Sequence, residues 1–179
     1  DPQRFLGDKY KSNDFEKLLI KWFNHPRSGS QNYKERLQIA DKIMELYPES
    51  SESYYIYART SAENSSSADR AKAINALEKS LSINKNNVLA TELLLALKFA
   101  GQDNAYKLKN DIALYEEFDK YSRELENEFP NSRLILSRIA NIYRNSYNYL
   151  DQSRYEIAEA KFKALMTILD QVKSSSKGL

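Results

Sequence analysis

The chain's 179 residues suffice for one domain or one compact repeat array, and only 4 Gly and 4 Pro beside 29% charged residues argue against a strand-rich fold. The 27 basic and 25 acidic residues are interleaved and leave a net charge of +2, so the basic stripe typical of nucleic-acid binders is missing. Cysteine is absent, which excludes disulfides, thiolate metal sites and cysteine nucleophiles.

Apolar residues recur at helical spacing through the first half of the chain and predict four helices there, over about residues 14–24, 32–47, 51–63 and 68–84. Gly29 and Pro48 fall between the first three helices, because neither residue continues a helix without cost. The side chains expected to face inward are Phe15, Leu18, Leu19, Trp22 and Phe23; Leu37, Ala40, Ile43, Met44 and Leu46; Tyr54, Tyr57 and Ala58; and Ala73, Ile74, Leu77, Leu81 and Ile83.

Four more helices are predicted in the second half, over about residues 88–100, 111–129, 132–147 and 153–173. The first of them is apolar nearly all round, which predicts cover on more than one side. The expected inward residues are Leu89, Leu93, Leu94, Leu97 and Phe99; Ile112, Tyr115, Phe118 and Leu125; and Ile157, Ala158, Phe162, Leu165, Met166 and Leu169. Residues 174–179 are expected to form a disordered tail.

Similar closing segments recur along the chain and indicate internal repeats. Helices end in Tyr47-Pro48-Glu49-Ser50, Asn84-Lys85-Asn86-Asn87 and Phe129-Pro130-Asn131-Ser132. Their spacing is somewhat longer than the period of about 34 residues that is typical of tetratricopeptide repeats. Inserted loop residues account for the excess. The low mean hydropathy of −0.70 suits such an elongated array, in which much of the surface is wet.

The chain resembles the tetratricopeptide-repeat (TPR) family over about residues 33–170. The residues that match its hairpin pattern are Leu136, Ile139, Ala140, Tyr143, Ala158 and Phe162 in the last repeat, and Tyr54, Tyr57, Ala58, Ala73 and Leu77 in the second. The repeats are degenerate, since Leu136 replaces the family's tryptophan and Phe118 stands where a small residue is usual. An irregular helical bundle or another α-solenoid are the alternative architectures.

The resemblance implies an all-α fold of about eight antiparallel helices, stacked as hairpins over about 14–47, 51–84, 88–129 and 132–173. These hairpins would form a single TPR-like domain over residues 1–173. Small residues are expected where two helices cross closely, because a larger side chain would push the hairpin apart. The residues in question are Ala58, Ala73, Ala140 and Ala158.

Catalytic chemistry is not indicated by any motif. His25 is the only histidine and precedes Pro26 in a turn, so we expect a loop residue without a zinc site or a serine-protease-like triad. The glutamates of residues 116–128 alternate with cations, as on a solvated helix face. The four glycines are isolated, so no phosphate-binding loop is expected. We therefore expect a non-enzyme without cofactor or metal.

In the resembled family, first helices line a groove that takes a peptide or a partner helix. The groove positions implied here are Glu52, Tyr55, Ile56, Arg59, Glu92, Ala96, Ser137, Asn141 and Arg144. The family's basic clamp for acidic C-termini is not reproduced, because Glu52 and Glu92 have the wrong sign. Alternatively, Tyr55 packs against the preceding hairpin and Arg59 pairs with Glu52 or Glu63.

These features together predict a non-catalytic protein–protein interaction scaffold with a peptide or protein partner. The alternatives are an accessory subunit of a bacterial envelope or transport assembly and an RNA-associated helical repeat protein. No run of 18 apolar residues exists, so no transmembrane segment is expected. The cytoplasm and a bacterial envelope both stay open as compartments.

Overall fold

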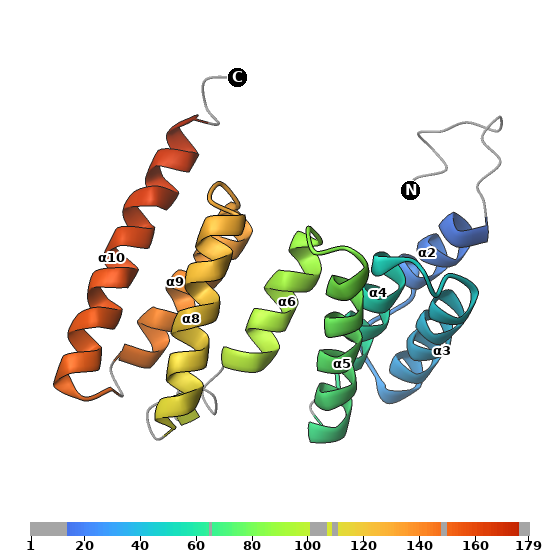
Figure 1. Ribbon diagram of the computed structural model, residues 1–179. Coiled ribbons are helices and arrows are strands. Elements are labelled where there is room, and N and C mark those ends of the chain that lie inside the picture. Colours follow the sequence, from blue (N-terminus) through green and yellow to red (C-terminus); the bar gives the residue numbers. More distant parts are fainter. Residues whose placement is uncertain (1–13, 65, 101–106, 109–110, 148–149, 176–179) are drawn as a thin grey trace. The chain divides into compact units, whose positions relative to one another are not determined.

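A computed structural model describes residues 14–64, 66–100, 107–108, 111–147 and 150–175 (Figure 1). Every element of regular structure in those residues is a helix, which confirms the predicted all-α fold. The helices are α2 (Asp14–Asn24), α3 (Ser30–Leu46), α4 (Ser51–Ser61), α5 (Ser67–Ile83), α6 (Val88–Phe99), α8 (Ile112–Glu128), α9 (Arg133–Tyr147) and α10 (Gln152–Ser175). The predicted boundaries agree to within about two residues.

Side chains at the helix starts explain several of these boundaries. The side chains of Ser66, Asn87 and Asp111 each accept a hydrogen bond, 3.0 Å long, from a backbone amide three residues later. Gly29 has a φ of 96°, a conformation that favours glycine, and it directly precedes α3. Helix α10 continues to Ser175, two residues into the predicted tail, whose residues 176–179 lie outside the described part.

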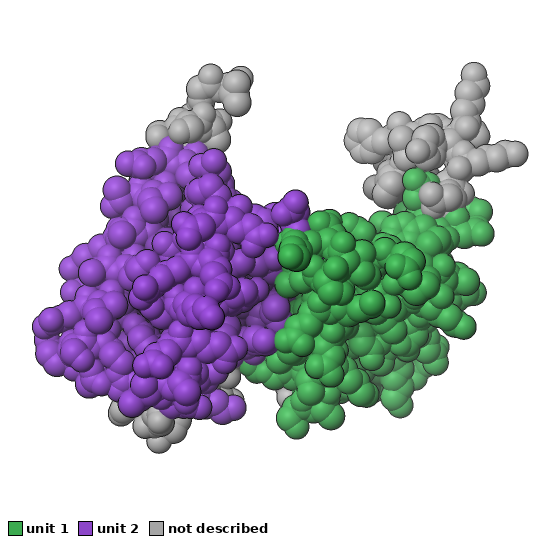
Figure 2. Space-filling view, viewed as in Figure 1, with its two compact units in different colours: residues 1–85 green, residues 86–179 purple. Residues whose placement is uncertain are grey.

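The helices fall into two compact units, residues 1–85 and residues 86–179 (Figure 2). The first contains α2 to α5 and the second contains α6 to α10. The boundary coincides with the junction between the second and third predicted hairpins. Each unit has its own core.

In the first unit, each helix packs against the next along the chain. The core is formed by Trp22, Ile39, Ala40, Ile43 and Ile56. Helix α4 lies against both α3 and α5, and the residues that it buries are mostly small: Ser51, Ser53, Ile56, Ala58, Thr60 and Ser61. Of the predicted inward stripe of Tyr54, Tyr57 and Ala58, Ala58 is fully buried and the half-buried Tyr57 packs against this core, whereas Tyr54 is half-buried and is not among the residues that pack against it.

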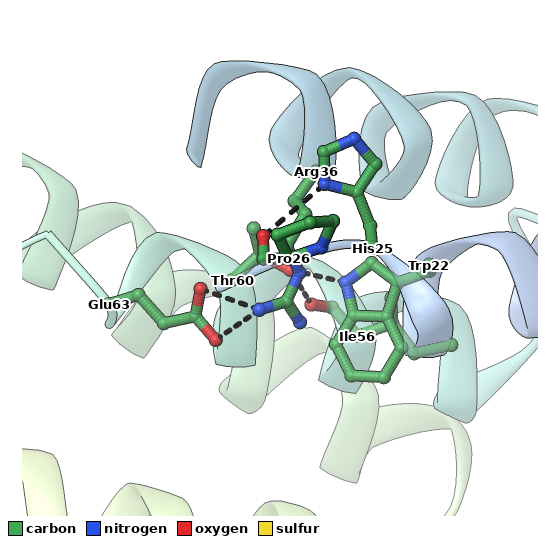
Figure 3. A network of polar contacts seen from close by, with 7 residues as sticks. All are labelled: Trp22, His25, Pro26, Arg36, Ile56, Thr60 and Glu63. Atoms are coloured by element: carbon green, nitrogen blue, oxygen red, sulfur yellow. Dashed lines mark hydrogen bonds and ion pairs between the residues drawn. The ribbon is translucent and has the colours of Figure 1, made fainter. Parts of the chain in front are cut away.

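A buried arginine joins three helices of this unit. Arg36 is fully buried, and its Nη1 donates to both carboxylate oxygens of Glu63, at 2.8 and 2.9 Å. Its guanidinium also lies 4.8 Å from the centre of the Trp22 ring, whose indole donates to the Thr60 hydroxyl at 2.8 Å. Figure 3 shows Arg36 between the Glu63 carboxylate and the Trp22 ring. This network links α2, α3 and the end of α4. The charged pair at its centre, Arg36 and Glu63, is 27 residues apart in the sequence.

In the second unit, α9 packs against α6, α8 and α10 and supplies much of the core. The ring of Phe118 lies 4.8 Å from that of Tyr143 and 5.3 Å from that of Phe99. The buried Tyr143 hydroxyl donates to Asp119 at 2.7 Å and lies 2.9 Å from the hydroxyl of Ser122. Burial raises the pKa of Tyr143 far above its usual value.

The four alanines predicted at close crossings are all buried, with at most 2% of the residue exposed. Ala58 and Ala73 belong to the packed pair α4 and α5, and Ala140 and Ala158 to the packed pair α9 and α10. Six predicted core residues are instead exposed, by 40–65%: Phe23, Leu46, Leu89, Ile112, Ile157 and Met166. Most lie near a helix end, where the apolar spacing extends beyond the cover of neighbouring helices.

Candidate binding groove

A groove of about 360 Å³ opens between α9 and α10. Its lining residues, hereafter the α9–α10 groove, are Arg133, Ser137, Ala140, Asn141 and Arg144 from α9 and Phe162, Met166, Leu169 and Asp170 from α10. Within each helix the lining residues share one face, because residues three, four or seven positions apart lie on the same side of a helix. The groove is therefore bounded by one stripe from each helix.

The floor of the α9–α10 groove is apolar. Ala140 and Leu169 are buried, Phe162 is half-buried, and Met166 is 40% exposed. An exposed methionine thioether is a flexible apolar contact that adapts to differently shaped partners. The floor thus offers apolar surface that a partner can cover.

The rim of the groove is polar and partly unpaired. Arg133, Asn141 and Arg144 are exposed, and their side chains have no hydrogen-bond or ion-pair partner among the described residues. The Ser137 hydroxyl already donates to the backbone oxygen of Leu134 at 3.1 Å. Asp170, on α10, is the single acidic group of the lining. The lining therefore presents two guanidiniums and one carboxylate.

Three of the nine predicted groove positions come together here, namely Ser137, Asn141 and Arg144. Glu92 lies on α6, and its Oε1 accepts a hydrogen bond of 2.6 Å from Nε of Arg138 on α9. This pair is mostly sheltered from solvent and ties α6 to α9. Glu92 thus acts within the unit and is not part of the α9–α10 groove.

The other predicted positions, Glu52, Tyr55 and Arg59, lie on α4 in the first unit. Tyr55 is half-buried and packs against that unit's core, and its neighbour Ile56 is only 4% exposed, so the prediction of Ile56 as a groove residue was wrong. Glu63 binds Arg36 and is not the partner of Arg59.

Sequence reasoning missed the part of the groove that α10 contributes, together with Arg133 from α9. The spacing of Phe162, Met166 and Leu169 predicts an inward stripe. Leu169 is buried and Phe162 packs against the core, but Met166 is 40% exposed, and the spacing does not reveal that difference. Only the packing of neighbouring helices supplies that information.

A second hollow, of about 350 Å³, lies between α2 and α3 and includes His25 and Glu35. His25 follows α2, as predicted for a loop residue, and its Nε2 lies 2.9 Å from Oε2 of Glu35. Hydrogen bonds from Gln31 and His25 lower the pKa of Glu35. In this hollow His25 and Glu35 already bind each other, whereas the guanidiniums of the α9–α10 groove have no partner among the described residues.

Within the residues described, no three His, Asp or Glu side chains gather in a way that could hold a metal ion. None of the helices in the described ranges has the length and apolar character needed to cross a membrane. No protein-family model and no curated protein sequence matches the chain.

Proposed function

We propose that this chain is a non-catalytic interaction scaffold that binds a partner protein or peptide in the α9–α10 groove. The observation that carries the proposal is the meeting of Ser137, Asn141 and Arg144 with an exposed apolar side chain, Met166, in one open hollow. An apolar floor with a polar rim is the usual anatomy of a protein-binding surface, and arginine is enriched in such surfaces.

We also propose that the architecture is a degenerate TPR-like array. The packing order of the helices and the buried alanines at close helix pairs support this proposal. The resemblance adds that binding surfaces in such arrays are built from helix faces and not from loops. In this chain the α9 face fits that role best, since α4 places Tyr55 against its own core.

A matched pair of variants tests the binding proposal. The groove variant carries Asn141→Lys and Met166→Glu, both at exposed positions of the lining. The control carries Lys163→Gln and Thr167→Lys at exposed positions of α10 outside the lining, and both variants leave the net charge unchanged. Parent and both variants are immobilised, and proteins captured from the source organism are identified by mass spectrometry.

We expect at least one protein to be captured by the parent and by the control but lost from the groove variant. If the groove variant, shown by circular dichroism to be folded, captures the same proteins as the parent, the groove is not the binding surface. Two alternatives give other results: an envelope or transport assembly would supply several subunits of one complex, and an RNA partner would be released steeply by added salt.

A further inference from the structure

The rim of the α9–α10 groove carries an unused pair of positive charges. Arg133 and Arg144 are both exposed, and neither guanidinium meets an acceptor among the described residues. Other arginines in the described part of the chain form ion pairs within the fold, as Arg36 does with Glu63 and Arg138 with Glu92. Arginine binds carboxylates through two parallel hydrogen bonds. The free pair is therefore suited to carboxylates of a partner.

The separation of the two arginines sets the distance at which a partner must place two acidic groups. Along α9 they lie three helical turns apart, or about 16 Å, and nearly on the same face. Between them the lining offers Ala140 from α9, and Phe162, Met166 and Leu169 from α10. A partner that reaches both arginines must therefore place two acidic groups about 16 Å apart, with apolar side chains between them.

The groove favours a helical occupant over an extended one. An extended peptide needs partners for its backbone amides and carbonyls, which strand-binding proteins supply from a sheet edge. Here the walls are helices whose backbone groups are bonded internally, and the Ser137 hydroxyl is already used. The Asn141 amide is the one uncharged polar side chain of the lining that is free within the described residues. A helix satisfies its own backbone and can lay a ridge of side chains into the groove between α9 and α10.

We infer that the α9–α10 groove binds an amphipathic helix of a partner protein that carries an acidic side chain at each end of a three-turn apolar seam. This inference rests on the proposed function and adds the class of partner. Asp170 reduces the positive charge of the lining to a net +1, so it tunes the attraction without reversing it. Removing its charge should strengthen binding of the acidic helix.

The probe is a library of hydrocarbon-stapled peptides of about 15 residues, long enough for three turns with a margin at each end. Two positions three turns apart carry Glu, Gln or Lys, and the seam between them varies among Ala, Leu, Met, Ile and Phe. The library is selected on the parent chain and on the double variant Arg133→Gln/Arg144→Gln. We expect Glu to be enriched at both end positions with the parent but not with the variant.

Affinities of the selected peptides, measured by fluorescence anisotropy, give the second part of the test. Because exposed ion pairs are weak, Arg133→Gln and Arg144→Gln should each weaken binding about two- to fivefold, and together about tenfold. Asp170→Asn should tighten it. The control Lys163→Gln removes one exposed cation from α10 outside the groove and should leave the affinity unchanged.

Several outcomes overturn the inference. They are enrichment of Lys at the end positions, equal enrichment on the parent and the double variant, no enrichment at all, or equal binding of a proline-containing, non-helical version of a selected peptide. Self-association of the parent that Arg144→Gln abolishes would assign the groove to a second copy of the chain. If the capture experiment still yields a groove-dependent partner that lacks an acidic helix, the proposed function stands and this inference alone fails.

Discussion

Removing the Glu63 carboxylate should destabilise the first unit strongly, because it leaves the buried charge of Arg36 without its carboxylate partner. The Arg36 side chain is 0% exposed, and its Nε and Nη2 have no hydrogen-bond partner among the described residues, so Glu63 supplies the only carboxylate that compensates it. Breaking a buried ion pair by deleting one partner costs about 3–5 kcal/mol. The Glu63 side chain is itself 16% exposed, which lets water reach the site after truncation. We therefore expect about 3 kcal/mol for Glu63→Ala.

The chain's single tryptophan allows the loss of stability caused by Glu63→Ala to be measured for the first unit alone. Trp22 is 6% exposed and lies against Arg36, so its fluorescence in a urea titration reports on the first unit. At about 0.05–0.15 kcal/mol per residue, some 70 residues hold about 4–11 kcal/mol, so the loss is a large part of the total. Glu45→Ala, at an exposed position of α3, should change the free energy of unfolding by less than about 0.5 kcal/mol.

A double variant separates charge from packing. Arg36→Leu combined with Glu63→Leu replaces the pair by apolar side chains and should restore most of the stability, since such replacements are often neutral or stabilising. A loss below about 1 kcal/mol for Glu63→Ala, or a double variant no more stable than the single one, would refute the role assigned to the pair.

Three further predictions concern the second unit. Ala140→Leu should overpack the α9–α10 pair and lower the free energy of unfolding by about 1–3 kcal/mol in urea titrations followed by circular dichroism, and a parent-like midpoint would contradict the close crossing. Tyr143→Phe removes a hydrogen bond to a mostly buried carboxylate and should cost about 1.5–3 kcal/mol in the same assay; no loss would mean that water replaces the bond. Hydrogen bonds from the Arg154 side chain and backbone lower the pKa of Asp151, so its stabilising contribution persists above its unfolded pKa and is lost only as the pH falls through the lower folded value. In an NMR titration Arg154→Gln should raise the pKa of Asp151, and an unchanged value would refute the cause.

The helix boundaries could be predicted because local chemistry sets them. Gly29, Pro48 and Pro130 stand between helices, and the caps at Asn87 and Asp111 are side chains of the expected type. The helix boundaries therefore depend on residues within a few positions of one another. The resemblance to tetratricopeptide repeats, and not local chemistry, implied the close packing at Ala58, Ala73, Ala140 and Ala158, and all four are buried.

Features that depend on distant residues could not be predicted. The burial of Arg36 requires Glu63 on one side and Trp22 on the other, and neither is near it in sequence. On α4 the predicted stripe of Tyr54, Tyr57 and Ala58 includes one fully buried residue, Ala58, and two half-buried tyrosines, while the other residues that α4 buries between its two flanking helices are mostly small. Periodicity reports which residues share a face, but it does not report how closely neighbours approach that face.

The same limit applies to the candidate site. Ser137, Asn141 and Arg144 share one stripe of α9, which can be predicted from their spacing, and all three line the α9–α10 groove. The other wall of the groove comes from α10, about 20 residues later in the chain. The pairing of Glu92 with Arg138 could not be predicted, because the two residues lie 46 positions apart in the sequence.

The most direct test of the central claim is methionine footprinting of the chain with and without its captured partner. The chain has two methionines: Met166 lies in the α9–α10 groove, and the half-buried Met44 lies on α3 in the first unit. Peroxide converts exposed methionine to sulfoxide, which mass spectrometry quantifies residue by residue. If the partner occupies the groove, oxidation of Met166 should slow severalfold while that of Met44 stays unchanged. An unchanged oxidation rate at Met166 in a saturated complex would contradict the groove as the binding surface.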